Sequence, residues 1–304
     1  MAHKIIAVWG VILSLFCLSS CEKDPLPYVD GMVDIIELTS IEPFTPKRLF
    51  QMSSFEVEPF SGNAQGMDIF DDRILFQAGT GQNYIHIIDL KESKALGTIS
   101  FVAPNNEKCH MNNINCGIKL NALDRFPLLY LSQTNSPKSC FVIRISNDAQ
   151  SYDIVQTIKY IGKNHYLKSS SYDWFVDYSN NFIYSYGHYN GDKDKREIMK
   201  FKLPSLDYQE IAFSDDDILD SFVLENQSIY QGSKMIDGLL YTPVGYGGGS
   251  YPGRLIIINL NTKEVVQDIP ISCGEPEAIA RYKSGAIISS GGGYPTYYYI
   301  RINN

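Results

Sequence analysis

Short apolar segments alternate with polar turns along most of the chain, and from about residue 64 this alternation repeats as a unit. Each unit contains two strands joined by a tight turn, a longer polar loop, and two further strands joined by a polar turn. In the first unit the strands are predicted at 67–70, 73–77, 84–90 and 95–101. Their length and their content of branched and aromatic residues favour β-strands over helices.

The remaining units follow the same order. Strands are expected at 114–118, 128–132, 141–145 and 152–160 in the second unit, and at 174–177, 182–186, 198–203 and 208–213 in the third. The fourth unit places them at 234–236, 239–244, 255–260 and 265–271, and the fifth at 278–282, 286–289 and 297–302. Segments 88–91 and 258–261 occupy equivalent turns. The corresponding residues of the second strands are Leu75, Leu129, Ile183, Leu240 and Ile287.

Four-stranded repeats of this length are typical of β-propeller blades. The sequence therefore predicts an all-β fold in which residues 33–304 form a single propeller of four-stranded antiparallel blades, with five blades counted and six possible. The last unit lacks one strand, and an N-terminal strand at 33–38 or 48–55 would complete it and close the ring. The alternative is two β-sandwich domains. Residues 215–222 are expected to form a short connecting helix or turn.

The N-terminus has a different pattern. Lys4 precedes an almost wholly apolar run at 5–18, which has the length of a signal peptide and is too short for a spanning helix. The next residues, Leu18-Ser19-Ser20-Cys21, resemble the lipobox of bacterial lipoproteins. This resemblance implies a signal peptide at 1–20, acylation of Cys21, and a lipid-anchored protein of the outer membrane or cell surface. Residues 21–32 are charged and contain prolines, and they are expected to be a flexible tether. The alternative is an ordinary signal cut nearby, with Cys21 a plain thiol.

Composition limits the possible partners. The formal charge of −8 and the lack of basic clusters argue against nucleic-acid binding. Four cysteines remain beyond Cys21, and they are either buried thiols or disulfides whose pairing is open: Cys109, Cys116, Cys140 and Cys273. There is no CxxC motif and no zinc-type spacing.

The segments that lead into the first strand of each unit are expected to meet at one end of the ring, which we call the axial mouth. Their candidate binding residues are Gln65, His110, Asn112, Asn113, Asp173, Trp174, Gln231, Glu275 and Glu277. Amides and carboxyls beside an aromatic face suit a neutral polar ligand, such as a glycan or peptide, or an envelope protein partner. The alternative is that these side chains cap strand ends.

The beginning of the repeat region also resembles a family. Gln65-Gly66-Met67-Asp68-Ile69, together with residues 110–113 before the segment 126–130, is similar to the TolB-like propeller lipoproteins of Gram-negative anaerobes. The resemblance implies a propeller fold and an envelope location. That family is usually described as six-bladed, whereas five units are counted here.

The residues offer three further chemistries. Glu275 and Glu277 alternate on one strand and are candidates for the acid and base of a hydrolase or lyase acting on glycan or peptide. No GxSxG or HExxH motif is present, and a non-catalytic role is favoured. No cofactor is expected, although calcium could bind His110 with the mouth carboxylates or the loop 190–194. The glycine-rich segments 245–253 and 291–293 carry or border tyrosines that form either an aromatic surface or packing between loops, namely Tyr246, Tyr251, Tyr294 and Tyr297.

Overall fold

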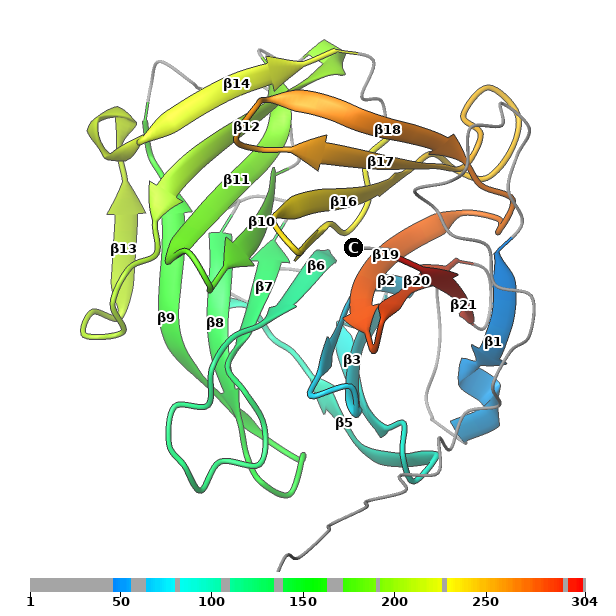
Figure 1. Ribbon diagram of the computed structural model, residues 1–304. Helices are drawn as coiled ribbons and strands as arrows, with labels where there is room; N and C mark the ends of the chain where they lie inside the picture. The colour runs from blue at the N-terminus through cyan, green and yellow to red at the C-terminus, as the bar shows by residue number, and fades with distance from the viewer. Residues whose placement is uncertain are drawn as a thin grey trace, which may run out of the picture.

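Five β-sheets surround a common centre and form a five-bladed β-propeller, which confirms the predicted fold and excludes two β-sandwich domains (Figure 1). The computed structural model describes residues 46–55, 64–79, 83–104, 110–133, 139–162, 172–189, 192–225, 229–291 and 295–302. Among these residues, no helix is long and apolar enough to cross a bilayer. The predicted signal peptide, Cys21 and the tether lie outside the described residues.

Each blade is named by its order in the chain. Blade 1 contains β2 (Ala64–Phe70), β3 (Ile74–Gly79), β4 (Tyr84–Asp89) and β5 (Lys94–Ser100). Blade 2 contains β6 (Met111–Cys116), β7 (Leu129–Gln133), β8 (Ser139–Ile145) and β9 (Tyr152–Tyr160). Blade 3 contains β10 (Tyr172–Asp177), β11 (Phe182–Tyr189), β12 (Asp192–Lys202) and β14 (Asp220–Leu224).

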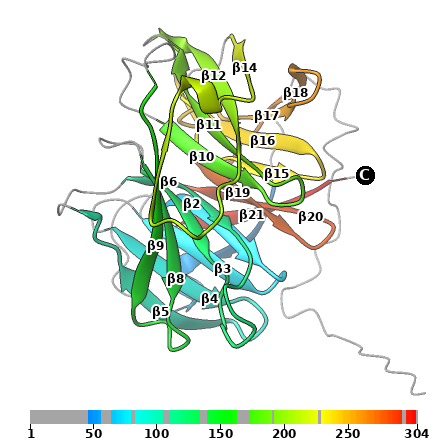
Figure 2. The ribbon, with the colours of Figure 1, turned by 90° about the vertical axis from the view of Figure 1, so that its left-hand side faces the viewer.

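Blade 4 contains β15 (Lys234–Ile236), β16 (Leu239–Val244), β17 (Arg254–Asn259) and β18 (Glu264–Pro270). Blade 5 contains β19 (Pro276–Tyr282), β20 (Gly285–Ser290), β21 (Thr296–Arg301) and β1 (Lys47–Gln51). Figures 1 and 2 both place β2, β6, β10 and β19 in the middle of the molecule, with the later strands of each sheet farther out.

The strand β1 closes the ring, as predicted for the second of the two candidate segments. It pairs antiparallel with β21, so that Arg48 lies opposite Tyr298. The ring of Phe50 stacks on Tyr297 with centroids 4.4 Å apart, and the following 3₁₀ turn η2 (Met52–Phe55) buries Met52. The other candidate, 33–38, lies outside the described residues.

The core lies between the blades. Its five apolar clusters each join two neighbouring blades, and together they run around the whole ring. The five second-strand residues aligned in the sequence are all fully buried, namely Leu75, Leu129, Ile183, Leu240 and Ile287. The sequence repeat therefore marks the positions that face a neighbouring sheet.

The fourth strand of blade 3 was predicted wrongly. The segment expected there, 208–213, forms β13 (Glu210–Phe213), which instead pairs in parallel with β9 as a fifth strand of blade 2. It does so because Phe213 stacks on Phe201 at 4.5 Å, within the core shared by blades 2 and 3. Figure 1 shows β13 at the left edge of the molecule beside β9.

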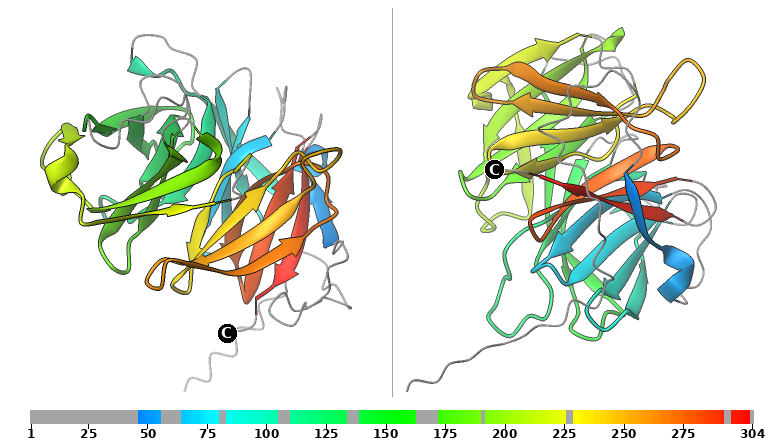
Figure 3. Two further views of the ribbon diagram at one scale, coloured as in Figure 1. Left: turned by 90° about the horizontal axis from the view of Figure 1, so that it is seen from above. Right: turned by 45° about the vertical axis from the view of Figure 1, so that its right-hand side comes forward.

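The true fourth strand is β14, which begins within the segment 215–222 that was expected to form a helix or turn and extends beyond it. Only Asp215–Asp217 form a 3₁₀ turn, η4, where the Asp217 carboxylate accepts a hydrogen bond from the backbone N of Ser214 at 2.7 Å. Beyond η4, β14 pairs with β12 and Leu224 reaches the core between blades 3 and 4. In Figure 3 (left) this turn and β13 stand apart from the sheet of blade 3.

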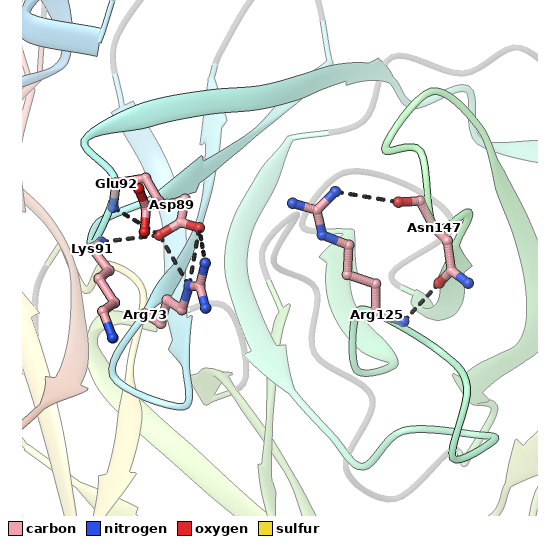
Figure 4. Close-up of polar contacts among 6 residues, drawn as sticks. All are labelled: Arg73, Asp89, Lys91, Glu92, Arg125 and Asn147. Atoms are coloured by element: carbon pink, nitrogen blue, oxygen red, sulfur yellow. Dashed lines mark hydrogen bonds and ion pairs between the residues drawn. The ribbon is translucent and has the colours of Figure 1, made fainter. Parts of the chain in front are cut away.

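In two of the polar turns between third and fourth strands, a side-chain oxygen accepts hydrogen bonds from the backbone of the turn. This confirms the predicted equivalence of segments 88–91 and 258–261. Oδ1 of Asp89 accepts hydrogen bonds from the backbone N of Lys91 and Glu92 at 3.0 and 3.1 Å, and Arg73 pairs with the same carboxylate (Figure 4). Oδ1 of Asn259 does the same for the two backbone N–H groups at 261 and 262. Such local acceptors favour turns over continued strand.

A different contact fixes the β6–β7 loop. Oδ1 of Asn147, in the β8–β9 turn, accepts a hydrogen bond from the backbone N of Arg125 at 2.6 Å, and the Arg125 guanidinium reaches the carbonyl of Asn147 at 3.4 Å (Figure 4). This loop carries no residue of the predicted axial mouth.

A buried ion pair links blades 1 and 4 across the ring. Asp68 in β2 pairs with the ammonium group of Lys234 in β15, and its carboxylate also accepts a hydrogen bond from the backbone N of Cys116 in β6 at 2.5 Å. The Asp68 side chain is fully buried and that of Lys234 is 14% exposed. One carboxylate therefore joins blades 1, 2 and 4.

Replacing Asp68 by alanine should leave the Lys234 ammonium buried without its partner, and urea unfolding should show a loss of about 3–5 kcal/mol. The control is Asp220→Ala, which removes an ion pair with Lys263 whose side chains are 43% and 40% exposed. That change should cost less than about 1 kcal/mol. Equal losses in the two variants would contradict a special role for the buried pair.

Candidate functional site

The amide of Gln65 links three of the segments that meet at the axial mouth. Gln65 lies in β2, and its Nε2 donates a hydrogen bond to Oε2 of Glu277 in β19 at 3.2 Å. Its Oε1 contacts Nε2 of His110, which precedes β6. Blades 1, 2 and 5 therefore meet here as predicted. Gln65 and Glu277 are 5% and 1% exposed.

A second amide, that of Gln77 in β3, hydrogen-bonds the backbone of Gln65. Its Nε2 donates to the carbonyl oxygen of Gln65 at 2.8 Å, and its Oε1 accepts a hydrogen bond from the hydroxyl of Tyr297 at 2.9 Å. Gln77 was not predicted as a site residue. The available signal was a glutamine within the otherwise apolar strand Ile74–Gly79, all of which is buried.

Glu275 and Glu277 bring two carboxyl groups to the mouth. Oε1 of Glu277 has no hydrogen-bond partner among the described residues, and Glu275 is half-buried. A Cβ added to Gly291 would lie 2.6 Å from Oε1 of Glu277 and 3.4 Å from Oε2 of Glu275, so both carboxyls face this point of the backbone. Burial, and then the charge of Glu275, raise the pKa of Glu277 to about 9. Burial also raises the pKa of Glu275. Glu277 is therefore a neutral acid at pH 7, able both to donate and to accept a hydrogen bond.

Asp173 in β10 adds a third carboxyl group. It is fully buried and accepts a hydrogen bond from Nδ2 of Asn112 at 2.6 Å, while its Oδ1 has no hydrogen-bond partner among the described residues. Burial raises the pKa of Asp173 to about 7, although the Asn112 bond and the charge of Arg196 act in the opposite direction. This carboxyl group therefore titrates close to neutral pH.

Arg196 in β12 is a buried cation that sequence reasoning missed. It is 1% exposed, and its guanidinium lies 4.5 Å from the ring centroid of Tyr230. Burial lowers its pKa, while the nearby groups Tyr186, Tyr230 and Asp173 raise it. No signal for this burial exists along the chain, because Arg196 belongs to a charged run at 192–197 that is typical of a solvated strand.

Two of the predicted binding residues, Asn113 and Trp174, make their contacts inside the ring. Nδ2 of Asn113 donates to the carbonyl oxygens of Trp174 and Ser233 at 3.0 Å each, which ties blades 2, 3 and 4 together. Trp174 is 1% exposed and lies in the core of blades 2 and 3, with its ring 6.0 Å from that of Phe201. Its indole is therefore not the aromatic face expected at the mouth.

Gln231 lies where blades 4 and 5 meet and is 6% exposed. Its neighbour Gly232 donates a backbone hydrogen bond to the carbonyl oxygen of Glu277 at 2.8 Å. A Cβ on Gly232 would lie 2.6 Å from the carbonyl oxygen of Asn112, so the backbone of blade 2 also lies against this glycine. The mouth residues of blades 2, 4 and 5 thus surround one glycine.

The described residues contain no group of three or more His, Cys, Asp or Glu side chains that could hold a metal ion. In the segment proposed for calcium, Oδ1 of Asp192 accepts a hydrogen bond from the backbone N of Asp194 at 2.9 Å, which is a local contact at the start of β12. The calcium hypothesis thus gains no geometric support in this part of the chain. Cys116, Cys140 and Cys273 are free thiols, whereas Cys109 lies outside the described residues.

No protein-family model and no curated protein matches the sequence. Among solved structures, the tail fiber of Staphylococcus aureus phage P68 is similar, with a TM-score of 0.56 at 13% identity over 86% of this chain. The chain spans about half of that fiber, 53% of its length. A luciferin-regenerating enzyme gives a TM-score of 0.45 at 9% identity, covering 84% of this chain and 98% of the enzyme. The likeness to the tail fiber concerns the fold alone, and a fold does not by itself determine a function.

The raised pKa of Glu277 predicts a pH-dependent stability. The folded chain holds this proton up to about pH 9, whereas an unfolded glutamic acid releases it near 4.5. Unfolding therefore releases a proton across that range, and stability falls as the pH rises, by at most about 1.4 kcal/mol per pH unit. Asp173 adds to this slope only below about pH 7.

Denaturant unfolding from about pH 7 to about pH 8.5 should therefore show a loss of stability that Glu277→Gln removes. Glu264→Gln, at an exposed position of β18, is the matched control and should keep the wild-type slope. A Glu277→Gln variant with the same slope as the wild type would show that this carboxyl group is ionised throughout.

Proposed function

We propose that this protein is a lipid-anchored propeller of the cell envelope or surface that binds a neutral polar ligand, a glycan or peptide, at the axial mouth without catalysis. The observation that carries the proposal is the carboxyl group of Glu277. It is 1% exposed, and one of its oxygens lacks a hydrogen-bond partner among the described residues. A buried polar atom that is left unsatisfied costs about 1–3 kcal/mol, which a ligand hydroxyl or amide would recover.

The chemistry of the mouth supports a neutral ligand. Glu277 is protonated at pH 7, and Gln65 and Asn112 offer amides that donate and accept. Arg196, whose charge acts on Asp173, is buried against Tyr230. The chain is acidic overall, which disfavours an anionic ligand. Perturbed carboxyl groups gathered at one end of a fold are typical of functional sites.

The anchor part of the proposal rests on the sequence. A positive start, an apolar run and the segment Leu18-Ser19-Ser20-Cys21 support lipidation of Cys21, and the TolB-like resemblance supports an envelope location. Two or more acyl chains on one cysteine would hold the protein firmly, at about 0.8 kcal/mol for each buried CH₂. The tether at 21–32 would keep the propeller away from the bilayer.

A second candidate function is a hydrolase or lyase that uses the same mouth. It is favoured by the position of Glu275 beside Glu277, with the pKa of both carboxyl groups raised by burial. Such a pair could divide the roles of acid and base. Products released from any bound oligosaccharide or peptide, and lost in Glu277→Gln, would favour this function over binding alone.

The mouth can be blocked without removing a polar group. Gly291→Ala should place a methyl group against the carboxyls of Glu275 and Glu277 and weaken ligand binding at least about tenfold in calorimetric titrations. Ligands would first be found by thermal-shift screening of oligosaccharides and short peptides, where saturation at 100 times the dissociation constant adds about 2.7 kcal/mol.

The control for this prediction is Glu264→Ala, because Glu264 is exposed on β18, the outermost strand of blade 4. It should keep both the affinity and the melting temperature of the wild type. If Gly291→Ala binds every ligand as the wild type does, the axial mouth is not the binding site.

The anchor has a separate test. Cys21→Ala in the full-length chain, expressed in a Gram-negative host, should abolish labelling by a radioactive fatty acid and move the protein out of the membrane fraction. Folding of the propeller, measured by circular dichroism, should not change, because the substitution precedes the first described strand. Retained label and membrane association would contradict lipidation at this residue.

A further inference from the structure

The loop between β16 and β17 is an ordered platform. Tyr246 donates a backbone hydrogen bond to the carbonyl oxygen of Tyr251 at 2.9 Å, and Tyr251 donates one to that of Gly248 at 3.2 Å. Gly245 and Gly247 have φ of 94° and 78°, which side chains rarely adopt, so the glycines permit this fold of the loop. The two tyrosines are thereby held as neighbours.

This platform lies against the backbone of the axial mouth. A Cβ on Gly247 would be 2.0 Å from the carbonyl carbon of Gly274 and 2.5 Å from the backbone N of Glu275. Another on Gly253 would be 3.3 Å from the carbonyl oxygen of Gly274. Figure 1 shows the loop at the right-hand end of blade 4, beside the connection from β18 to β19. The segment that carries Glu275 therefore also packs against the β16–β17 loop.

The tyrosine side chains on the platform are exposed. Tyr246 is 53% and Tyr251 is 44% exposed, and their rings meet edge to face with centroids 5.8 Å apart. Tyr297, one of the other tyrosines considered for this surface, is instead fully buried, and Tyr294 lies outside the described residues. Two exposed aromatic rings on an ordered loop offer apolar contact at a small cost in conformational entropy.

We infer that the ligand of the axial mouth is a neutral oligosaccharide of several units, with one sugar at Glu275 and Glu277 and a following sugar on the rings of Tyr246 and Tyr251. The inference rests on the proposed function and specifies its ligand class. A sugar presents hydroxyl groups at its rim and apolar C–H groups on its faces. Carboxyls and amides at one point, followed by tyrosine rings, match both kinds of surface.

The same features disfavour an extended peptide. Peptides bound along a sheet need unpaired backbone N–H and C=O groups at an edge. In the platform, the N–H groups of Tyr246 and Tyr251 are already used within the loop. The N–H of Gly291, next to the carboxyls, is likewise bonded to the carbonyl oxygen of Glu275 at 2.7 Å. Side-chain acids, amides and rings remain, and these recognise hydroxyl and C–H groups.

The test uses the whole propeller and neutral cello-, xylo-, manno- and malto-oligosaccharides of two to six units in calorimetric titrations. For the series that binds, affinity should rise with chain length. Tyr246→Ala/Tyr251→Ala should weaken binding of the longest member at least about tenfold and leave the shortest unchanged. Tyr246→Phe/Tyr251→Phe should keep most of the affinity, because the rings remain. Tyr208→Ala removes a tyrosine that is 66% exposed elsewhere and should have no effect.

The outcomes separate this inference from the proposed function. If oligosaccharides bind and are lost in Gly291→Ala but not in the tyrosine double variant, the mouth stands as the site and the tyrosine subsite is wrong. If only peptides bind, and Gly291→Ala abolishes that binding, the mouth again stands and the glycan inference is overturned. If no member of the four series binds, the inference is overturned as well, and the peptide titrations alone decide the proposed function.

Discussion

The centre of the ring is so narrow that inner strands meet backbone to backbone, and the rest of the structure depends on that contact. A Cβ on Gly66 would lie 2.6 Å from the backbone of Asn113, a separation that only glycine permits. Because polar backbone groups here are buried, they need partners from another blade. Asn113 supplies two carbonyl groups with donors, and the hydroxyl of Ser132 both donates to and accepts from the backbone of Trp174. The five blades are thus joined by polar contacts at the axis and by apolar clusters farther out.

The same narrowness explains the chemistry of the axial mouth. The side chains at the beginnings of the first strands lie close together around the axis. Glu277 and Asp173 are therefore buried, and burial raises the pKa of both carboxyl groups. Their positions are fixed by strands rather than by mobile loops, since Gln65 is itself held by Gln77. Such support would keep these side chains in place before any ligand bound, and this would reduce the ordering cost of binding. The ring geometry therefore explains the burial of these carboxyl groups, and Oε1 of Glu277 has no hydrogen-bond partner among the residues that the structure describes.

Most of the fold could be predicted because every blade must bury the same strand positions against its neighbours, and the sequence pattern repeats with them. The second strand of each blade belongs to a sheet that packs against a neighbouring sheet on each side, so its side chains must be apolar. Leu75 and Ile287, which are fully buried, show this directly. Turn residues are equally local, so Asp89 and Asn259 could be matched from the sequence alone. The exchange of β13 and β14 could not be predicted, because the choice depends on whether Phe213 meets Phe201, a contact between blades.

The candidate site shows the same division. The approach of Gln65, His110 and Glu277 followed from the expected geometry of a propeller, because all three lie at equivalent ends of first strands. The burial of Trp174 did not follow, since a residue at a strand end can point either to the mouth or between the blades. Arg196 was hidden for the opposite reason: charged neighbours along the chain suggested water, whereas Tyr230 comes from the next blade.

The strand β13 joins blades 2 and 3, in addition to the β1–β21 pairing that closes the ring. The chain leaves blade 3, pairs in parallel with β9 of blade 2, and returns to complete blade 3 as β14. Blade 3 can therefore not be peeled away as a unit without pulling a strand from its neighbour. Blades 2 and 3 are interlocked through the path of the chain, so they should open and refold together as one cooperative unit, even under tension that separates other blades.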